Sequence, residues 1–583
     1  MKESYDAIVV GGGHNGLVCA CYLARGGLKT LVLERRGIVG GAAVTEEFHP
    51  GFRNSTASYT VSLLHPKVIR ELHLAEHGLR IVERPLANFL PLPEDEESPS
   101  GSPFPPGGKG EGNGGYLKVG PDTAATQREL ARFSRRDAER LPDYEAMLER
   151  AATVLRELAL ATPPAVGAGL PAMFQTLREG RKLWKLPRAV QRDLLALFTR
   201  SAAEFLDAWF ESEPIKAAFG FDAVVGNYAS PYTPGSAYVL LHHVFGEVNG
   251  KRGAWGHAIG GMGAITQAMA QEAERLGVEI RLNAPVAEVT VENEHAARAG
   301  GTPALPRSDK VTVAKEHAAG VMLESGEKIT ARRIVAGVHP KLLFGKLIAP
   351  EHLDADFRTR IEHYKSGSGT LRMNVALAEL PDFTCLPGAG PHLGAGIIMA
   401  PSLAYMDRAF TDARREGFSR EPIVEMCIPS TLDDSLAPPG KHVASLFCQH
   451  FAPHLPDGRS WDEEREAAAD AVIETVNRHA PNFKSSILGR MVLTPLDLER
   501  RFGLIGGDIF HGALTLDQLG PARPVLGHGD YRGPLAGLYL CGSGTHPGGG
   551  VTGLPGHNAA REILRDARWR RWRLRQVEKR VTE

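Results

Sequence analysis

YDAIVVGGGHNG, at residues 5–16, is the stretch that decides the fold. Its first part is short and mostly apolar, which predicts a buried strand of a parallel sheet, and glycines follow it at once. Gly11, Gly13 and Gly16 form the pattern G-x-G-x-x-G at the start of the next expected helix. The segment KTLVLE, at residues 29–34, is the second expected strand, so the chain opens with a β-α-β unit.

The glycines of this pattern suit a nucleotide with a diphosphate. The first permits a tight turn, the second lets the backbone approach a pyrophosphate, and the third lets the helix pack closely on the strand. N–H groups at the helix N-terminus then point at the phosphates. Glu34 ends the second strand 18 residues after Gly16, near the spacing expected for a carboxylate that binds a ribose. Because a carboxylate repels a 2′-phosphate, the site favours an unphosphorylated adenosine ribose, which both NAD and FAD contain.

A second glycine-rich stretch lies near the other end of the chain. LYLCGSGTHPGGGVTG, at residues 538–553, predicts a strand, a glycine loop and the start of a helix. Glycines without side chains let such a loop lie directly against a phosphate or a flat ring. The two loops raise the question of why one chain places ligand-binding glycines at both of its ends.

The residues after Glu34 resemble those of a large flavoprotein superfamily that contains the amine oxidases and the phytoene desaturases. ERRGIVGGAA, at residues 34–43, places Gly40 and Gly41 where that superfamily has a glycine pair beside the flavin's pyrophosphate. The superfamily usually continues with an arginine, whereas this chain has Ala42, which removes one cation near the flavin. The resemblance implies that the cofactor is FAD and that both ends of the chain hold it together.

The same resemblance implies FAD contacts along the chain. It places Gly542 and Gly544 near the pyrophosphate and the ribityl chain, and residues 550–552 at the pyrimidine edge of the flavin. A helix N-terminus at that edge stabilises negative charge on the reduced ring. The backbone of Val286, in a strand after the stretch that begins at Gly260, is expected to cover the adenine. The implied FAD-binding residues are Gly11, Gly13, Asn15, Gly16, Glu34, Arg35, Arg36, Gly40, Gly41, Ala42, Ser58, Val286, Gly542, Gly544, Gly550, Val551 and Thr552.

Three further stretches resemble one branch of this superfamily, the pyridine nucleotide-disulphide oxidoreductase domain-containing protein two family, a relative of the phytoene desaturases. They are residues 206–246, 424–447 and 498–519, and the resemblance covers nearly the whole chain apart from 94–115 and the basic C-terminal end. The sequence has no C-x-x-C pair and no second β-α-β fingerprint suited to a pyridine nucleotide. We therefore expect FAD alone, without a dithiol redox site or an NADPH domain.

We expect an α/β fold with a Rossmann-like FAD-binding domain from both chain ends, an inserted mixed α/β substrate domain and a helical cap. Residues 94–115 are acidic and then rich in proline, glycine and serine, so we expect a disordered loop there. The other expected boundaries are 1–90, 251–345 and 521–567 for the FAD-binding domain, 116–250 for the helical cap, 346–520 for the substrate domain and 568–583 for a basic tail.

Catalytic candidates come from the chemistry of the flavin, which carries out the difficult step while the protein orients the substrate and handles protons. Histidine suits this task because its pKa lies near neutral pH. His546 lies inside the expected flavin-facing loop and is the first candidate. Asp508, His511 and the pair His242 and His243 are further candidates, and for each of them a hydrogen-bonded structural role is the commoner alternative.

Composition argues against several other classes of protein. The formal net charge is −1, which gives no whole-molecule attraction to nucleic acid. Six cysteines in 583 residues argue against a disulfide framework and are typical of a reducing compartment. The histidines lack metal-binding spacing, and no G-x-S-x-G motif is present, so neither a metal site nor a serine nucleophile is expected. No apolar leader precedes Tyr5 and no run of about 18 apolar residues occurs, which predicts a cytoplasmic protein.

Two stretches combine basic residues with tryptophan. Residues 177–198 contain Trp184, and residues 568–580 contain Trp569 and Trp572. Such stretches can lie on an anionic membrane surface, where an enzyme would collect a lipophilic substrate. The alternative is a solvated helix face whose arginines extend to water. We therefore expect a cytoplasmic protein, with peripheral contact with the inner membrane as an open alternative.

The resulting expectation is an FAD-dependent oxidoreductase that passes hydride from an apolar or partly apolar small molecule to flavin N5, with oxygen or a quinone as electron acceptor. Residues 57–59 lie where relatives line the flavin ring but lack the usual phytoene-desaturase residues, so carotenoid chemistry is not implied. Two alternatives stay open: a redox-neutral flavin isomerase or saturase, and a flavin-binding regulatory or scaffold protein with little turnover. A homodimer is also open.

Overall fold

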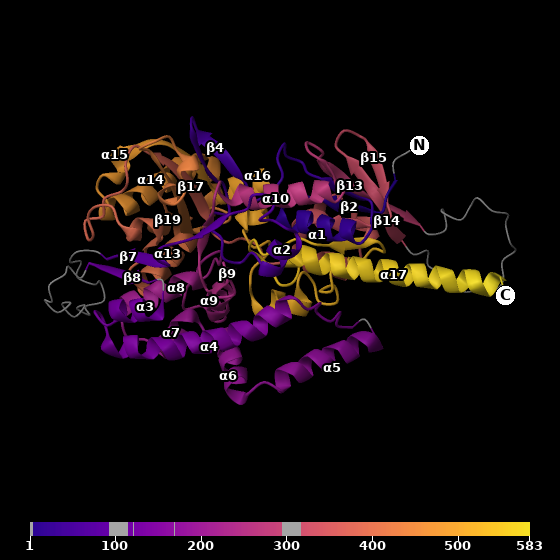
Figure 1. Cartoon of the computed structure of the whole chain (residues 1–583), viewed down its shortest axis with the longest axis horizontal. Coiled ribbons are helices and arrows are strands. Elements are labelled where there is room, and N and C mark those ends of the chain that lie inside the picture. Colours follow the sequence, from indigo (N-terminus) through magenta and orange to yellow (C-terminus); the bar gives the residue numbers. More distant parts are fainter. Residues whose placement is uncertain (1–3, 93–114, 121, 168, 294–315, 583) are drawn as a thin grey trace.

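The computed structural model describes residues 4–92, 115–120, 122–167, 169–293 and 316–582. The loop predicted at 94–115 lies outside these residues, apart from Gly115. The described chain forms an α/β fold with two large sheets and a helical region, and Figure 1 shows that α17 runs back along α1.

A five-stranded parallel sheet joins the two ends of the chain. Its order is β12 (Glu279–Arg281), β3 (Thr30–Leu33), β2 (Ala7–Val10), β16 (Ile334–Ala336) and β22 (Leu538–Leu540). Each neighbouring pair is parallel, and β16 lies between the N-terminal strand β2 and the C-terminal strand β22. This confirms the predicted Rossmann-like domain built from both chain ends.

Helices cover one face of this sheet. They are α1 (His14–Arg25), α10 (Met262–Arg275) and α17 (Leu554–Thr582), whose apolar side chains pack with those of the strands. A Cβ added at Gly16 would lie 2.1 Å from the oxygen of Gly11, and one added at Gly556 would lie 2.1 Å from the oxygen of Asn15. These glycines therefore let α1 approach both its preceding loop and α17. The basic residues 568–582 continue α17.

The other face packs against a smaller sheet. This sheet has the order β1 (Ser4–Tyr5), β15 (Lys328–Ala331), β14 (Glu316–Leu323) and β13 (Val286–Asn293). Its apolar residues join those of α12 (Ala355–Glu362) and of the turn Leu343–Leu347 in one core.

A seven-stranded sheet forms the second layer. Its order is β21 (Ile487–Leu493), β17 (Leu371–Leu377), β20 (His442–Phe451), β19 (Phe418–Cys427), β18 (Gly396–Met399), β7 (Asn88–Pro91) and β8 (Tyr116–Val119). The strands β7 and β8 come from outside residues 346–520, the expected substrate domain. One face of the sheet packs on α14 (Trp461–His479).

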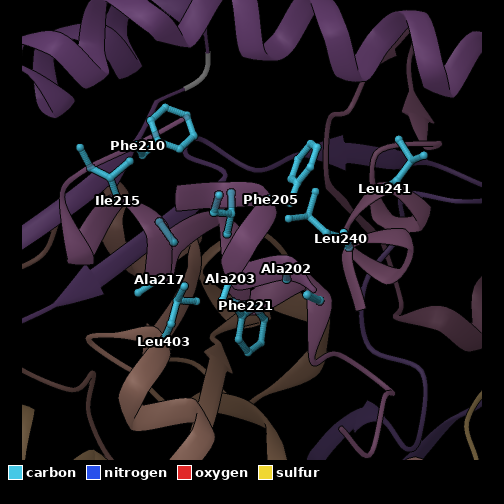
Figure 2. Close-up of a cluster of buried hydrophobic side chains, with 14 of the residues drawn as sticks. Ala202, Ala203, Phe205, Phe210, Ile215, Ala217, Phe221, Leu240, Leu241 and Leu403 are labelled. Carbon is cyan, nitrogen blue, oxygen red and sulfur yellow. The ribbon is translucent and has the colours of Figure 1, made fainter. Parts of the chain in front are cut away.

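The helical region expected between residues 116 and 250 is present. It contains α3 (Thr123–Leu130), α4 (Arg135–Ala159), α5 (Leu170–Trp184), α6 (Arg188–Thr199), α7 (Ala202–Asp207), α8 (Glu213–Gly220) and α9 (Ser236–His243). Figure 2 shows its core, where Phe205, Phe221 and their neighbours meet Leu403 of α13 (Leu403–Glu416). The helical region is therefore anchored on the seven-stranded sheet.

Candidate active site

A first cavity of about 280 Å³ opens at the carboxyl ends of the parallel strands, where ligands of such sheets bind. The loops that follow β2, β3 and β16 line it, together with the start of β13. Ten of the predicted FAD-binding residues are among its walls: Gly11, Gly13, Asn15, Gly16, Glu34, Arg35, Arg36, Gly41, Ala42 and Val286.

Glu34 is held in place at the edge of this cavity. Its carboxylate accepts the N–H of Gly12 at 2.8 Å through Oε2 and the N–H of Arg36 at 2.9 Å through Oε1. A carboxylate can accept about four hydrogen bonds, so both oxygens keep capacity for the hydroxyls of a ribose. The side chain is buried, which strengthens such bonds.

The residues around the diphosphate position fit FAD. A Cβ added at Gly13 would have no neighbour closer than the Cα of Gly41, at 4.0 Å, so the space beside Gly13 belongs to the cavity. Asn15 donates to Ser543 Oγ at 3.0 Å, which ties the two glycine loops together, while its own Oδ1 has no partner among the described residues. Arg36 pairs with Glu46 at 2.8 Å, and its Nη1 is buried without a described partner. These atoms are free to bind a polar ligand.

A second cavity of about 130 Å³ continues from the first. His14, Ala42, Leu504, His511 and Ser543 line both, so the two cavities meet at these residues. The walls of the second cavity are mostly apolar and include Leu63, Val225, Trp255, Phe447, Ile509 and Phe510. Four of the predicted site residues lie only here: Ser58, His243, Gly550 and Val551. Tyr59, the last residue of the stretch 57–59 that was expected beside the flavin ring, lines this cavity as well.

Four predicted FAD-binding residues are not among the walls of either cavity. Gly40 has a φ of +125°, and a Cβ there would lie 2.5 Å from the oxygen of Ala43. Gly542 and Gly544 are likewise crowded by Gly337 and Pro340, and Thr552 accepts the N–H of Leu554 at 3.1 Å at the start of α17. These residues shape the loops, and their contact with FAD stays a prediction.

Three histidines lie at or beside the junction, and two of them were not predicted. His14 begins α1, His339 follows β16, and the rings of His339 and His511 lie 5.5 Å apart. Burial lowers the pKa of His14 to about 4 and that of His511 to about 3, and it holds the pKa of His339 well below its usual value. The imidazoles are therefore neutral at pH 7. His14 Nε2 and His511 Nδ1 have no partner among the described residues.

The other catalytic candidates have different surroundings. His243 lines the second cavity, and its Nδ1 hydrogen-bonds the carbonyl of Val239 at 2.9 Å. The buried His242 packs edge-on against Phe510.

Asp508 and His546 line neither cavity. Asp508 is buried and accepts the N–H groups of Gly367 and Phe510, both at 2.8 Å. His546 Nε2 hydrogen-bonds the carbonyl of Leu158 at 2.9 Å. This placement favours His511 over His546 for chemistry.

Two residues of the site that were not predicted, His14 and His339, do stand at positions that the sequence marks. His14 stands inside the G-x-G-x-x-G stretch, and His339 follows a parallel strand, the position where ligands meet such sheets. No local signal marks Ser543, Trp255 or Phe447, which come together only through the fold.

No helix in the described part of the chain is long and apolar enough to cross a membrane. The same residues contain no group of three or more His, Cys, Asp or Glu side chains arranged as metal ligands. All six cysteines are buried and free.

Comparison with known proteins gives consistent matches. A family model described as flavin containing amine oxidoreductase matches residues 16–371. The chain is 41% identical over 580 residues to pyridine nucleotide-disulfide oxidoreductase domain-containing protein 2 of Rattus norvegicus, covering 97% of this chain and 94% of that protein. It is 26% identical to a lycopene-forming phytoene desaturase of Pseudescherichia vulneris, covering 94% and 96%. The solved structure of an oxidoreductase from Methanosarcina mazei shares the fold, with a TM-score of 0.57 at 14% identity and coverage of 97% and 100%.

Proposed function

We propose that this chain, a member of the flavin-containing amine oxidoreductase family and an FAD-dependent oxidoreductase, takes hydride from an apolar or partly apolar small molecule. Oxygen or a quinone is the proposed electron acceptor. The observation that carries this proposal is the apolar second cavity, which continues from the nucleotide cavity through five shared residues. The phytoene desaturase among the relatives, named for a hydrocarbon substrate, supports it.

The residues of the chain divide the work between the two cavities. Glu34 and the glycine loops hold the nucleotide half, and FAD, when bound, supplies a hydride acceptor at N5. Leu63, Trp255 and Ile509 give the second cavity apolar walls that exclude water from the reacting bond. His511 is neutral, and its Nδ1 has no partner among the described residues where the cavities meet, so it can accept a hydrogen bond or a proton in transit there. Its lowered pKa of about 3 means that it would pass such a proton on rather than keep it.

The first test uses the holoprotein. A panel of hydrocarbon and isoprenoid compounds is mixed with it without oxygen, and we expect a member of the panel to bleach the flavin band. His511→Gln should keep bound FAD while lowering the rate constant of bleaching by about a hundredfold, the usual range for a lost proton acceptor. His363→Gln, at an exposed position, is the matched control and should react like the wild type. Bleaching that is equally fast in His511→Gln would contradict the role of His511.

Two other readings are separated by the same experiment. A redox-neutral isomerase would convert a substrate only after the flavin has been reduced beforehand, and it would leave the flavin reduced. A saturase would also need the reduced flavin, but it would pass hydride to the substrate and thereby restore the yellow band. A flavin-binding scaffold would bind FAD and respond to no compound under either condition. The apolar cavity beside a free imidazole favours turnover over a scaffold.

A membrane surface is the proposed source of an apolar substrate, and helix α5 is the proposed contact. Its apolar side chains recur at helical spacing and are exposed, with Phe174 at 64%, Leu177 at 61% and Trp184 at 83%. Arg181 and Lys182 lie in its last turn, a charge that suits anionic lipid. Figure 1 shows α5 at the lower edge of the molecule.

We expect the protein to pellet with vesicles of phosphatidylcholine and phosphatidylglycerol, and less with phosphatidylcholine alone. Phe174→Ser combined with Trp184→Ser should lower the bound fraction about tenfold or more, because two large apolar groups no longer enter the lipid. The control combines Leu282→Ser with Leu488→Ser, at exposed apolar positions outside α5. Equal pelleting of both double variants, or none by the wild type, would refute contact through α5.

A further inference from the structure

The seven-stranded sheet reaches the second cavity through one residue of β20. Phe447 of β20 lines the cavity, and it pairs directly with Arg372 of β17 on one side and with Glu425 of β19 on the other. Residues directly opposite one another on neighbouring strands project from the same face. Arg372 and Glu425 therefore flank a wall residue of the cavity on the same face of the sheet, although neither is itself among the residues that line the cavity.

Arg372 lies against the aromatic walls of the cavity with most of its donors unused. Its guanidinium carbon is 4.4 Å from the ring centre of Tyr59 and 5.7 Å from that of Phe447, and both rings line the cavity. Its Nη2 donates to Ser445 Oγ at 2.6 Å. Nε and Nη1, which carry three of the five N–H groups, have no partner among the described residues, although Arg372 is only 1% exposed.

The charges around Arg372 do not balance. No carboxylate of the described residues forms an ion pair with it, and the nearby Glu425 is already engaged with Arg84 at 3.7 Å and with the hydroxyl of Tyr59. The side chain of Arg84 is buried as well, so the surroundings of Glu425 hold two guanidinium groups, those of Arg84 and Arg372, and one paired carboxylate. Asp222 does not restore the balance, because burial and then the charge of Glu425 raise its pKa to about 8.

An unpaired buried cation costs stability, and an arginine remains charged in proteins. The missing partner is therefore an anion that arrives with a ligand. The planar guanidinium offers donors in a fork that matches the two oxygens of a carboxylate. The remaining walls are mostly apolar, which favours a ligand whose other part is apolar too.

We propose that Arg372 binds the carboxylate of an otherwise apolar substrate in the second cavity. This inference rests on the proposed function, because it requires that the second cavity receive the substrate. It narrows the substrate class from apolar molecules in general to apolar acids. The carboxylate at Arg372 then holds one end of the substrate in place, which orients the rest toward the junction with the first cavity.

The test compares carboxylates with uncharged amides of the same shape. Cinnamate and decanoate, each beside its amide, are titrated into the yellow holoprotein, and binding is followed by calorimetry and by the shift of the flavin band. We expect the wild type to bind at least one carboxylate about tenfold more tightly than its amide. Arg372→Met should lose this preference, with amide affinity nearly unchanged, and Arg372→Lys should keep part of it.

The control is Arg490→Met, on the neighbouring strand β21 and opposite Val375, whose side chain packs on the other face of the sheet. It should keep the full preference for the carboxylate. Equal affinity for acid and amide in the wild type, an unchanged preference in Arg372→Met, or no binding of either carboxylate would each overturn the inference. Failure of the proposed function is a separate result, because it would appear as protein without flavin or as flavin that no compound bleaches.

Discussion

Gly13→Val is expected to fold normally and to purify as a colourless protein without FAD. Gly13 has a φ of −70° and a ψ of 168°, which a valine adopts without strain. A Cβ there meets no atom of the chain closer than the Cα of Gly41, so the side chain has room to extend into the first cavity, which Gly13 lines. The pyrophosphate must pass that point, and overpacking of this kind lowers affinity about a hundredfold.

Two other glycines make the result specific. In Gly16→Ala the new Cβ would lie 2.1 Å from the oxygen of Gly11, so we expect loss of stability itself, seen as a lower melting temperature. Gly180→Val, where no atom lies within 4 Å, should stay yellow and stable. The measurements are the visible spectrum, FAD binding by fluorescence and thermal unfolding. A yellow Gly13→Val protein with unchanged FAD affinity would show that the diphosphate lies elsewhere.

The cofactor end of the site could be predicted because its signals are local. The order strand, G-x-G-x-x-G, helix and the carboxylate of Glu34 follow from backbone geometry within a short stretch, and both Gly13 and Glu34 line the first cavity. The pairing of the two chain ends came from the family resemblance, since no local pattern links Asn15 to Ser543 across 528 residues.

The substrate end could not be predicted in the same way. Arg372 becomes notable only when Tyr59 and Ser445, far away in the chain, surround it and leave its other donors unpaired. The surroundings of His546 could likewise not be predicted from its loop. Its loop was expected to aim it at the flavin, but the end of α4 lies close enough for the carbonyl of Leu158 to take its hydrogen bond.

The stability of the protein should fall steeply as the pH is lowered from 7 to 5. Burial lowers the pKa values of eight histidines to about 3 or about 4: His14, His65, His242, His243, His450, His479, His511 and His546. In the unfolded chain each takes up a proton below about pH 6.5. Between that pH and the folded pKa the unfolded state binds more protons, so the free energy of unfolding decreases as the pH falls.

The loss of stability from the histidines is larger than the gain from Asp222. Each histidine costs about 2 kcal/mol between pH 7 and pH 5. Asp222, with its raised pKa of about 8, takes up a proton at a higher pH in the folded state than in the unfolded chain. Its protonation therefore adds about 3 kcal/mol to the free energy of unfolding over the same interval. Domains are typically stable by only about 5–15 kcal/mol, so the remaining loss is a large share of the stability of a domain.

Urea unfolding of the apoprotein at pH 7, 6 and 5 measures this slope directly, because cofactor loss cannot contribute. His450 packs edge-on against the rings of Tyr228 and Phe410, and neither of its ring nitrogens has a partner among the described residues. His450→Leu therefore removes a buried polar group at little cost at pH 7. It should flatten the dependence by about 1.4 kcal/mol per pH unit, the contribution of one proton. His363→Leu, at an exposed position, is the matched control and should keep the wild-type slope. A wild-type stability that is constant from pH 7 to pH 5 would mean that these imidazoles are not held neutral by burial.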